Sequence, residues 1–249
     1  MNYYLLNNDC LKVLPTLKDK QVDLVVTSPP YYHVKKYSGV QGELDEGTVS
    51  SYSTKLYTLF KEFNRILKDN GVLCLNIDNG KRNEDGSYTI SSWDIATLEG
   101  ATNLKLINTI IWYDKVRRPS SSDYLLSHKY EPIFIFAKSK NITFNKDLLE
   151  PKYRQDVWEL NYSSSISQAL YDRSGIATFP VSLTDNLIKL YSNERDTVLE
   201  PFMGSGTTLE SCIRLKRNFI GTEISKEYFN NCVNRAKQFI HIDDSLKVF

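Results

Sequence analysis

Short apolar runs alternate with amphipathic stretches along most of the chain. Residues 51–68 carry Leu56, Leu59 and Phe63 at helical spacing, while residues 22–27 are apolar enough to form a buried strand. The expected strands cover residues 3–6, 22–27, 72–77, 106–113, 131–137, a short stretch from Thr197, and 218–223; the expected helices cover 51–68, 91–103, 181–192, 226–238 and a stretch that begins near Thr207. Such alternation predicts one α/β domain with a doubly wound, mostly parallel sheet and helices on both faces.

Two stretches lie outside this alternation. Residues 33–50 are polar and contain glycine, and residues 139–176 are irregular, with turn signals at 163–165 and 172–175. A long irregular stretch inside a compact domain usually has a function of its own. Residues 139–176 therefore predict an inserted functional segment, with a set of ordinary surface loops as the alternative.

The first candidate motif is the run Ser28-Pro29-Pro30-Tyr31, which follows the expected strand 22–27. Two consecutive prolines fix their own φ angles and lack N–H donors, and a residue before a proline is pushed toward extended geometry. The Ser28 hydroxyl and the Pro29 carbonyl can then accept hydrogen bonds from an NH₂ group, while Tyr31 offers a ring for stacking. These groups suit a flat base held by its exocyclic amine. A plain strand-ending turn is the alternative, because Pro-Pro is a common loop signal.

The second candidate motif is the glycine loop, Phe202-Met203-Gly204-Ser205-Gly206, where a short strand again runs into a turn and a helix. Gly204 and Gly206 let the backbone pass close to a ligand without interference from a Cβ atom. Glu223 ends the next expected strand, about 20 positions on, which is the usual spacing for a carboxylate that holds ribose hydroxyls. A tight strand–helix turn is the alternative for the glycines alone.

Together the two motifs resemble those of the DNA amino-methyltransferases, which methylate adenine N6 or cytosine N4 with S-adenosylmethionine. In that family a Ser/Asp/Asn-Pro-Pro-Tyr/Phe tetrapeptide is the catalytic motif, and a Phe-x-Gly-x-Gly segment binds the cofactor. Further segments that look like the family's extend over nearly the whole chain: residues 8–10, 57–77, 110–113, 128–138 and 177–180. The catalytic motif precedes the cofactor motif, as in the class usually called beta.

The resemblance implies a Rossmann-like methyltransferase fold and a set of site residues. The catalytic residues would be Ser28, Pro29, Pro30 and Tyr31. S-adenosyl-L-methionine would be bound by Asp9, Cys10, Phe179, Pro180, Glu200, Phe202, Gly204, Ser205, Gly206, Thr207 and Glu223. Glu200 stands where Asp is commoner in the family, and the longer acid should still reach the charged end of the cofactor. Residues 139–176, helped by 114–124, would be the inserted segment that reads the DNA sequence.

The target base stays open between two alternatives. Hydrogen bonds from the exocyclic amine to fixed acceptors localise the lone pair of the nitrogen as the new bond forms, so no covalent enzyme intermediate is needed. In a duplex the base must first be flipped out of the stack. Within the family, Ser at the first motif position goes mostly with cytosine N4, and Asp or Asn goes mostly with adenine N6. Ser28 therefore favours cytosine N4.

The charge of the chain is nearly balanced, at +1. A nucleic-acid partner therefore requires local positive charge. The candidate DNA contacts are basic residues that all lie between the two motifs: Lys35, Lys36, Lys115, Arg117, Arg118, Lys152 and Arg154. Each short basic group is on its own typical of a solvated loop, and the common location is what favours double-stranded DNA as the partner.

The remaining features bear on metal sites and localisation. The four cysteines form no Cys-x-x-Cys or His/Cys cluster, so neither a zinc site nor a disulfide framework is expected. The start of the chain lacks a basic region followed by an apolar core, and no run approaches about 18 apolar residues. We therefore expect an intracellular, cytoplasmic protein without membrane contact, as a monomer or homodimer. A cognate restriction endonuclease is a candidate functional partner.

Three other classes of protein remain as alternatives. A methyltransferase that acts on RNA or on a protein glutamine would share the fold, although the glutamine enzymes carry Asn at the position of Ser28. An inactive DNA-binding relative should have lost the Pro-Pro-Tyr run or the glycines, and this chain keeps both. A nicotinamide enzyme is disfavoured because the third glycine of that fingerprint is absent, with Thr208 and Leu209 in its neighbourhood.

Overall fold

A computed structural model of the chain describes residues 1–34, 43–97, 102–114, 123–160, 180–240 and 244–249. The strands are β1 (Asn2–Leu6), β2 (Val22–Thr27), β3 (Leu67–Asn76), β4 (Lys105–Tyr113), β5 (Tyr130–Ala137), β6 (Val157–Glu159), β7 (Thr197–Glu200), β8 (Asn218–Thr222) and β9 (Ser245–Val248). The α-helices are α1 (Cys10–Val13), α2 (Val49–Ile66), α3 (Ser92–Ala96), α5 (Val181–Tyr191), α6 (Thr207–Arg214) and α7 (Lys226–Ala236). Short 3₁₀ turns are η1 (Leu14–Thr16), η3 (Lys146–Leu148) and η4 (Pro151–Tyr153).

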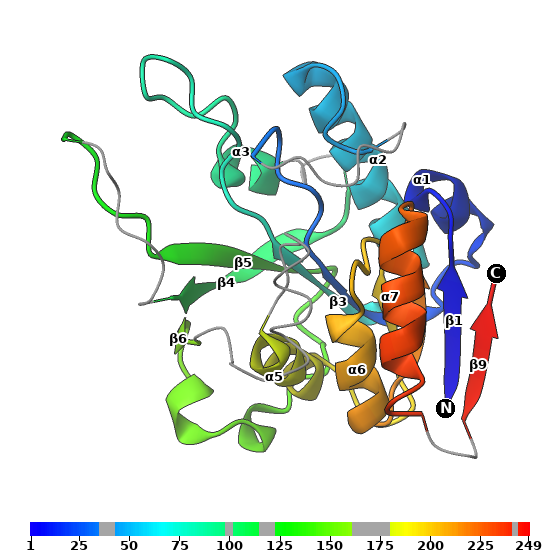
Figure 1. Cartoon of the computed structure of the whole chain (residues 1–249). Helices are drawn as coiled ribbons and strands as arrows, with labels where there is room; N and C mark the ends of the chain where they lie inside the picture. The colour runs from blue at the N-terminus through cyan, green and yellow to red at the C-terminus, as the bar shows by residue number, and fades with distance from the viewer. Residues whose placement is uncertain (35–42, 98–101, 115–122, 161–179, 241–243) are drawn as a thin grey trace.

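Within the described residues the strands form one nine-stranded sheet in the order β6-β4-β5-β3-β2-β7-β8-β1-β9 (Figure 1). Only β5 runs antiparallel to its neighbours, β3 and β4. All other strand pairs of this sheet are parallel. The predicted α/β class with a mostly parallel sheet is confirmed.

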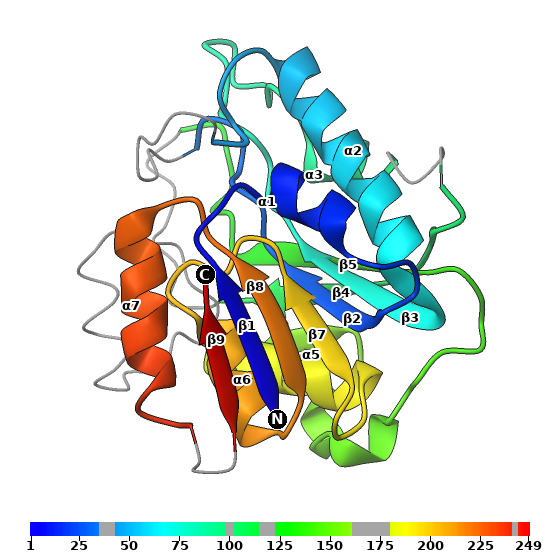
Figure 2. The same ribbon diagram turned by 90° about the vertical axis from the view of Figure 1, so that its right-hand side faces the viewer.

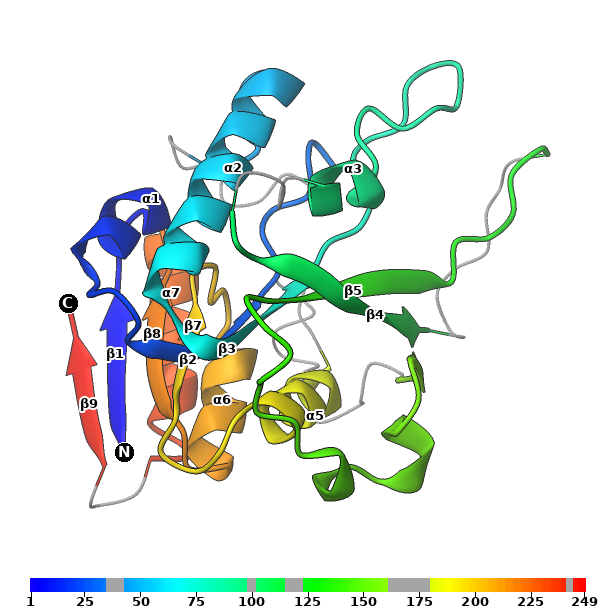
Figure 3. The same ribbon diagram turned by 180° about the vertical axis from the view of Figure 1, so that it is seen from behind.

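Helices cover both faces of the sheet (Figure 2 and Figure 3). Because successive side chains of a strand point to opposite faces, Leu24 and Val26 of β2 pack in one core cluster with residues of α5, α6 and α7. Val25, between them, packs in the second cluster with residues of α1, α2 and α3. Both faces of β2 are thus packed in apolar cores, as the mostly apolar run at 22–26 indicates.

The strand order reverses between β2 and β7. From β2 the chain crosses through α2 to β3 on one side, and from β7 it crosses through α6 to β8 on the other. Such a reversal opens a crevice beyond the carboxyl ends of the strands, where ligands bind in open α/β sheets. The Ser28–Tyr31 motif leaves β2 and the glycine loop leaves β7, so both candidate motifs lie at this point.

Several boundaries differ from the sequence prediction. Helix α2 ends at Ile66 rather than at 68, because Leu67 already pairs with Val22 and β3 begins there. Helix α3 ends at Ala96, well before the predicted residue 103. Strands β6 and β9 were not predicted at all. Residues 139–160 of the expected inserted segment contain η3, η4 and β6, and the rest of that segment lies outside the described residues.

Candidate functional site

The two motifs are joined by a hydrogen bond although they lie far apart in sequence. Strands β2 and β7 are direct neighbours, with Leu24 opposite Val198. The Thr27 hydroxyl donates to Glu200 Oε1 over 2.7 Å, across a separation of 173 residues. Glu200 Oε1 also accepts from the backbone N–H of Phe202 at 3.1 Å. One carboxyl group therefore holds the start of the Ser28–Tyr31 motif against the start of the glycine loop.

Burial changes the acidity of Glu200, which is only 2% exposed. Desolvation raises the pKa of Glu200 from 4.5 to about 8, while hydrogen bonds from Thr27, Phe202 and Thr208 act in the opposite direction. The carboxyl group is consequently neutral for the most part near pH 7. Its oxygens are occupied by these protein groups, so its structural role is clear, and the predicted contact with a cofactor stays a prediction.

The Ser28–Tyr31 motif is held by a hydrogen bond from a buried tyrosine of α2. The hydroxyl of Tyr52 donates to the carbonyl of Pro30 at 2.8 Å, and Tyr52 itself is fully buried. Pro29 is buried, while Ser28 and Tyr31 are only half-buried. The arrangement holds the proline corner rigidly and leaves Ser28 and Tyr31 partly accessible.

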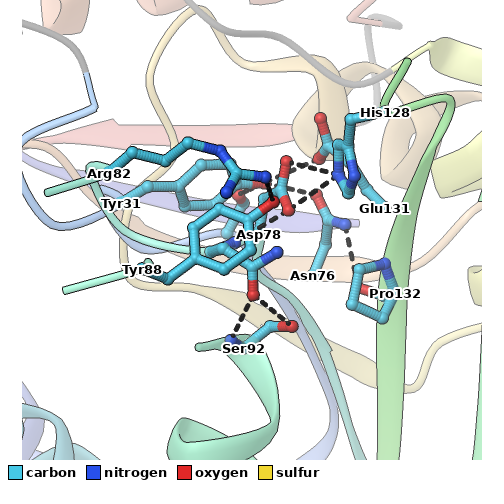
Figure 4. Close-up of polar contacts among 11 residues, drawn as sticks. Tyr31, Asn76, Asp78, Arg82, Tyr88, Ser92, His128, Glu131 and Pro132 are labelled. Carbon is cyan, nitrogen blue, oxygen red and sulfur yellow. Dashed lines mark hydrogen bonds and ion pairs between the residues drawn. The ribbon is translucent and has the colours of Figure 1, made fainter. Parts of the chain in front are cut away.

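Beside the motif, the hydroxyl of Tyr31 joins residues of three strand ends (Figure 4). It lies 3.3 Å from Ser28 Oγ, 3.0 Å from Asn76 Oδ1 and 2.8 Å from Glu131 Oε2. Burial, followed by the charge of Glu131, raises the pKa of Tyr31 well above its ordinary value. The phenol is therefore neutral at physiological pH and acts through its hydrogen bonds.

Sequence reasoning missed Asn76 and Glu131. Asn76 ends β3, next to β2, and its position at the tip of a predicted strand could have drawn attention to it. Glu131 lies near the start of β5, and only an antiparallel β5 brings that end of the strand to the motif. Nearby, His128 Nε2 lies 3.0 Å from Asp78 Oδ1, so a hydrogen bond between two further side chains flanks the same edge.

The glycine loop is closed by Glu223, at the end of β8. Its carboxylate accepts from the N–H of Gly204 at 3.0 Å and from the N–H of Ser225 at 2.8 Å. Burial raises the pKa of Glu223, and these two hydrogen bonds lower it. The space available to a side chain differs between the two glycines. A Cβ on Gly206 would lie 2.7 Å from Cys232 Sγ, whereas a Cβ on Gly204 would meet only open space, with its nearest neighbour at 4.0 Å.

Ser205 and Thr207 face the protein interior and are 2% and 5% exposed. Arg235 of α7 lies 3.3 Å from Thr207 Oγ1 and 3.4 Å from the carbonyl of Ser205. The same guanidinium forms a buried ion pair with Glu210 at 2.6 Å. Through Ser205 and Thr207, Arg235 holds the glycine loop against α7, while Gly204 lies on the open side of the loop.

Two further predicted cofactor residues, Asp9 and Cys10, follow β1, whose end lies beside the end of β8. Asp9 caps α1 by accepting from the N–H of Leu11 at 2.9 Å, and Cys10 is buried beneath it. The amide of Asn7 donates to the carbonyl of Glu223 at 2.8 Å, so the ends of β1 and β8 lie together. Pro180 is buried directly before α5, and Phe179 lies outside the described residues.

The predicted DNA contacts are not gathered at this edge in the described part of the chain. Lys35, Lys36, Lys115, Arg117 and Arg118 lie outside the described residues. Lys152 pairs with Glu150 at 3.1 Å, and Arg154 donates to the carbonyl of Leu149 at 3.0 Å. The light-green turns that carry them lie toward the N-terminal ends of the central parallel strands, opposite to the motif edge (Figure 1 and Figure 2).

Three further features of the described residues concern metal binding, disulfides and membranes. No group of three or more His, Cys, Asp or Glu side chains there is placed to hold a metal ion. The four cysteines, Cys10, Cys74, Cys212 and Cys232, are all buried and unbridged. No helix in the described ranges has the length and apolar character needed to cross a membrane.

Comparisons with known proteins agree with this geometry. Solved structures with the same fold include the cytosine-N4-specific PvuII DNA methyltransferase, with a TM-score of 0.80, 20% identity and coverage of 98% of this chain and 88% of that one. A putative DNA modification methylase from Thermus thermophilus, complexed with S-adenosyl-L-methionine, matches with a TM-score of 0.75, 23% identity and coverage of 99% and 98%.

Sequence relatives include type II methyltransferase M.Cfr9I of Citrobacter freundii, 26% identical over 94% of this chain and 87% of the relative. Orphan methyltransferase M.BamHII of Bacillus amyloliquefaciens is 29% identical over 89% and 91%. The model of the N6/N4 family described as DNA methylase matches residues 22–234, which include both motifs and all the strands that carry them. The chain belongs to the N6/N4 DNA methylase family.

Proposed function

We propose that this protein is a site-specific DNA methyltransferase that transfers a methyl group from S-adenosyl-L-methionine to the exocyclic N4 of cytosine in duplex DNA. The observation that carries the proposal is the junction between β2 and β7, where Thr27 and Glu200 hold the Ser-Pro-Pro-Tyr motif beside the glycine loop. A base at the first motif would lie next to a cofactor at the second. Transfer between two bound groups requires such proximity.

The residues at the glycine loop fit an adenosyl cofactor. Space over Gly204 permits close approach to the backbone, and the Glu223 carboxylate at the end of β8 is the group expected on the ribose hydroxyls. When bound, the cofactor supplies an electrophilic methyl group on its sulfonium. Asp9 and Cys10, at the end of β1, would border the adenine, and Phe202 would line the same pocket. Membership of the family and the cofactor in the Thermus structure support this assignment.

At the first motif, Ser28 and Pro29 supply the acceptors. The Ser28 hydroxyl and the Pro29 carbonyl would accept the two N–H groups of the target amine, and the ring of Tyr31 would stack on the base. Fixed acceptors stabilise the positive charge that develops on the nitrogen, without reorganisation at the moment of reaction. The base would be flipped out of the duplex, and base–aromatic stacking of about 1–3 kcal/mol offsets part of that cost.

Ser at position 28 is the ground for choosing cytosine over adenine. The cytosine-N4 specificity of the PvuII enzyme, which shares this fold, supports the choice. Adenine N6 is the alternative, because both bases present a similar N–C=N edge. The type II names among the relatives support a role in a restriction–modification system with a cognate endonuclease.

The test is incubation with labelled S-adenosyl-L-methionine and, separately, duplex DNA, RNA and protein, with a Ser28→Ala variant as the control. We expect label in DNA only, as N4-methylcytosine after digestion to nucleosides, and a large loss with Ser28→Ala. N6-methyladenine as the product would overturn the choice of base. Label in RNA or protein alone would overturn the proposed DNA substrate.

A further inference from the structure

The hydroxyl groups of Ser28 and Tyr31 form a chain that ends on Glu131, and Figure 4 shows Tyr31 and Glu131 side by side. Ser28 Oγ lies 3.3 Å from the Tyr31 oxygen, which in turn lies 2.8 Å from Glu131 Oε2. A phenol has one proton to donate, and a carboxylate can only accept. The Tyr31 proton therefore points to Glu131, away from Ser28, and the Tyr31 oxygen presents a lone pair to the Ser28 hydroxyl.

Asn76 supports the same direction of the chain. Its amide nitrogen donates to the carbonyl of Pro132 at 3.1 Å, which leaves the amide oxygen facing the Tyr31 hydroxyl at 3.0 Å. Both partners of Tyr31 on this side are therefore acceptors. Of the two, Glu131 is closer and carries a charge, and hydrogen bonds to charged acceptors are roughly twice as strong as neutral ones.

The direction of this chain decides what Ser28 can do. A serine hydroxyl rotates, so on its own it offers either a proton or a lone pair to a substrate. In the chain, its proton is given to Tyr31, and its lone pairs remain for a donor on the other side. A negative charge at the far end also polarises both hydroxyls, which increases the negative charge on Ser28 Oγ.

We propose that Glu131 is a positioning residue that orients and polarises the Tyr31–Ser28 hydroxyl chain, so that Ser28 meets the target amine as an acceptor. The inference rests on the proposed function, in which Ser28 accepts an N–H of the base. It adds a second role to Tyr31, whose hydroxyl transmits the effect of Glu131 while its ring stacks. The role depends on the register of β5, which places Glu131 beside the tip of β3.

The experiment compares single-turnover methylation rates of the full-length protein on its duplex substrate with those of three variants. Glu131→Gln keeps the size of the side chain and removes its charge, Tyr31→Phe keeps the ring and removes the hydroxyl, and the third variant combines both. We expect Glu131→Gln to lower the rate about tenfold, the difference between a charged and a neutral hydrogen bond. Tyr31→Phe should lower it at least as much, and the double variant should equal Tyr31→Phe, because both changes break one chain.

Three further measurements on Glu131→Gln separate a positioning role from a role in stabilising the fold. The affinities for DNA and for S-adenosyl-L-methionine, and the melting temperature, should stay at wild-type values in Glu131→Gln. Glu131→Asp, which keeps the charge, should recover part of the rate if Glu131→Gln proves unstable. Glu194→Gln is the matched control, because that side chain is exposed in the turn before β7, at the opposite end of this strand from the glycine loop.

A wild-type rate in Glu131→Gln would overturn the proposal, as would independent, multiplying losses in the double variant. A parallel loss of rate, affinity and melting temperature would make Glu131 a structural residue instead. These outcomes are distinct from failure of the proposed function, in which the unaltered protein would not methylate DNA at all.

Discussion

Replacement of Glu200 by Gln should stabilise the protein at alkaline pH. Glu200 is a buried acid that contacts only hydroxyl and amide groups in the contacts described for it, with no positive side chain among them. The carbonyl of a Gln at this position can accept from Thr27 and from the N–H of Phe202. Its NH₂ group can donate to Thr208 Oγ1, which lies 3.2 Å from Glu200 Oε2. The variant therefore keeps the hydrogen bonds and removes the ionisable proton.

The size of the effect follows from the pKa of Glu200, which is raised from 4.5 to about 8. Between these values the folded protein retains a proton that the unfolded chain has lost, so the free energy of unfolding falls as pH rises. The slope is about 1.4 kcal/mol per pH unit, and the contribution of this group drops by about 3–4 kcal/mol between pH 5 and pH 8. The contribution is fully present only below the unfolded pKa.

Urea unfolding at a series of pH values from 5 to 8.5, without DNA or cofactor, measures this difference. Other carboxyl groups with raised pKa values, such as the buried Glu223 and the half-buried Asp196, change stability in the same direction, so the comparison must be between the wild type and Glu200→Gln. The two proteins should be closest in stability at pH 5, and the variant should gain on the wild type as pH rises. Glu150→Gln, on the surface, should run parallel to the wild type.

Parallel pH curves for the wild type and Glu200→Gln would refute the reasoning. They would mean that Glu200 is ionised in the folded protein near neutral pH, and hence that the hydrogen bonds from Thr27, Phe202 and Thr208 outweigh desolvation. A variant that loses stability steadily with pH relative to the wild type would refute it more strongly.

Three further predictions concern the glycine loop. Arg235→Met should lower the free energy of unfolding by about 3–5 kcal/mol in urea titrations, because it removes the buried partner of the Glu210 carboxylate at 2.6 Å and leaves Arg214 at 3.7 Å as the remaining cation beside it. Gly206→Ala should destabilise by about 1–3 kcal/mol, because the new Cβ overlaps Cys232 Sγ, and Cys232→Ala should relieve part of the loss in thermal melts. Glu223→Ala should weaken S-adenosyl-L-methionine binding at least about tenfold by calorimetry, since a charge-assisted hydrogen bond is lost; unchanged affinity would remove Glu223 from the site.

The strands that carry the two motifs were predictable because each is a short apolar run followed by residues that do not continue a strand. Pro29 and Pro30 end the run at 22–27, and the positive φ of Gly204 and Gly206 ends the run at Thr197. The alternation of helices and strands then predicted a parallel sheet. In such a sheet the carboxyl ends of strands share one edge, so the meeting of the two motifs followed from the fold class.

The missed features depend on tertiary contacts that leave little local signal. Strand β6 has three residues, which is too short for an alternating pattern to be recognised in the sequence. Its extended conformation is held by pairing with β4. Leu67 continues the apolar spacing of the helix before it, yet it pairs with Val22 and is the first residue of β3. Glu131 stands at the start of a strand rather than at its end, and only the reversed direction of β5 brings it to Tyr31.

Glu200, a predicted cofactor contact, also joins the two motifs, and the sequence alone did not indicate this second role. Its side chain follows β7 directly, so the sequence alone could point it either into the crevice or back to β2. Thr27, at the facing position of β2, decides the direction by donating to Oε1. A neutral Glu200 must place its proton on Oε2, where Thr208 Oγ1 can accept it, whereas an ionised Glu200 requires Thr208 to donate. The protonation state of this one acid therefore sets the hydrogen bonds at the first turn of α6, directly behind the glycine loop.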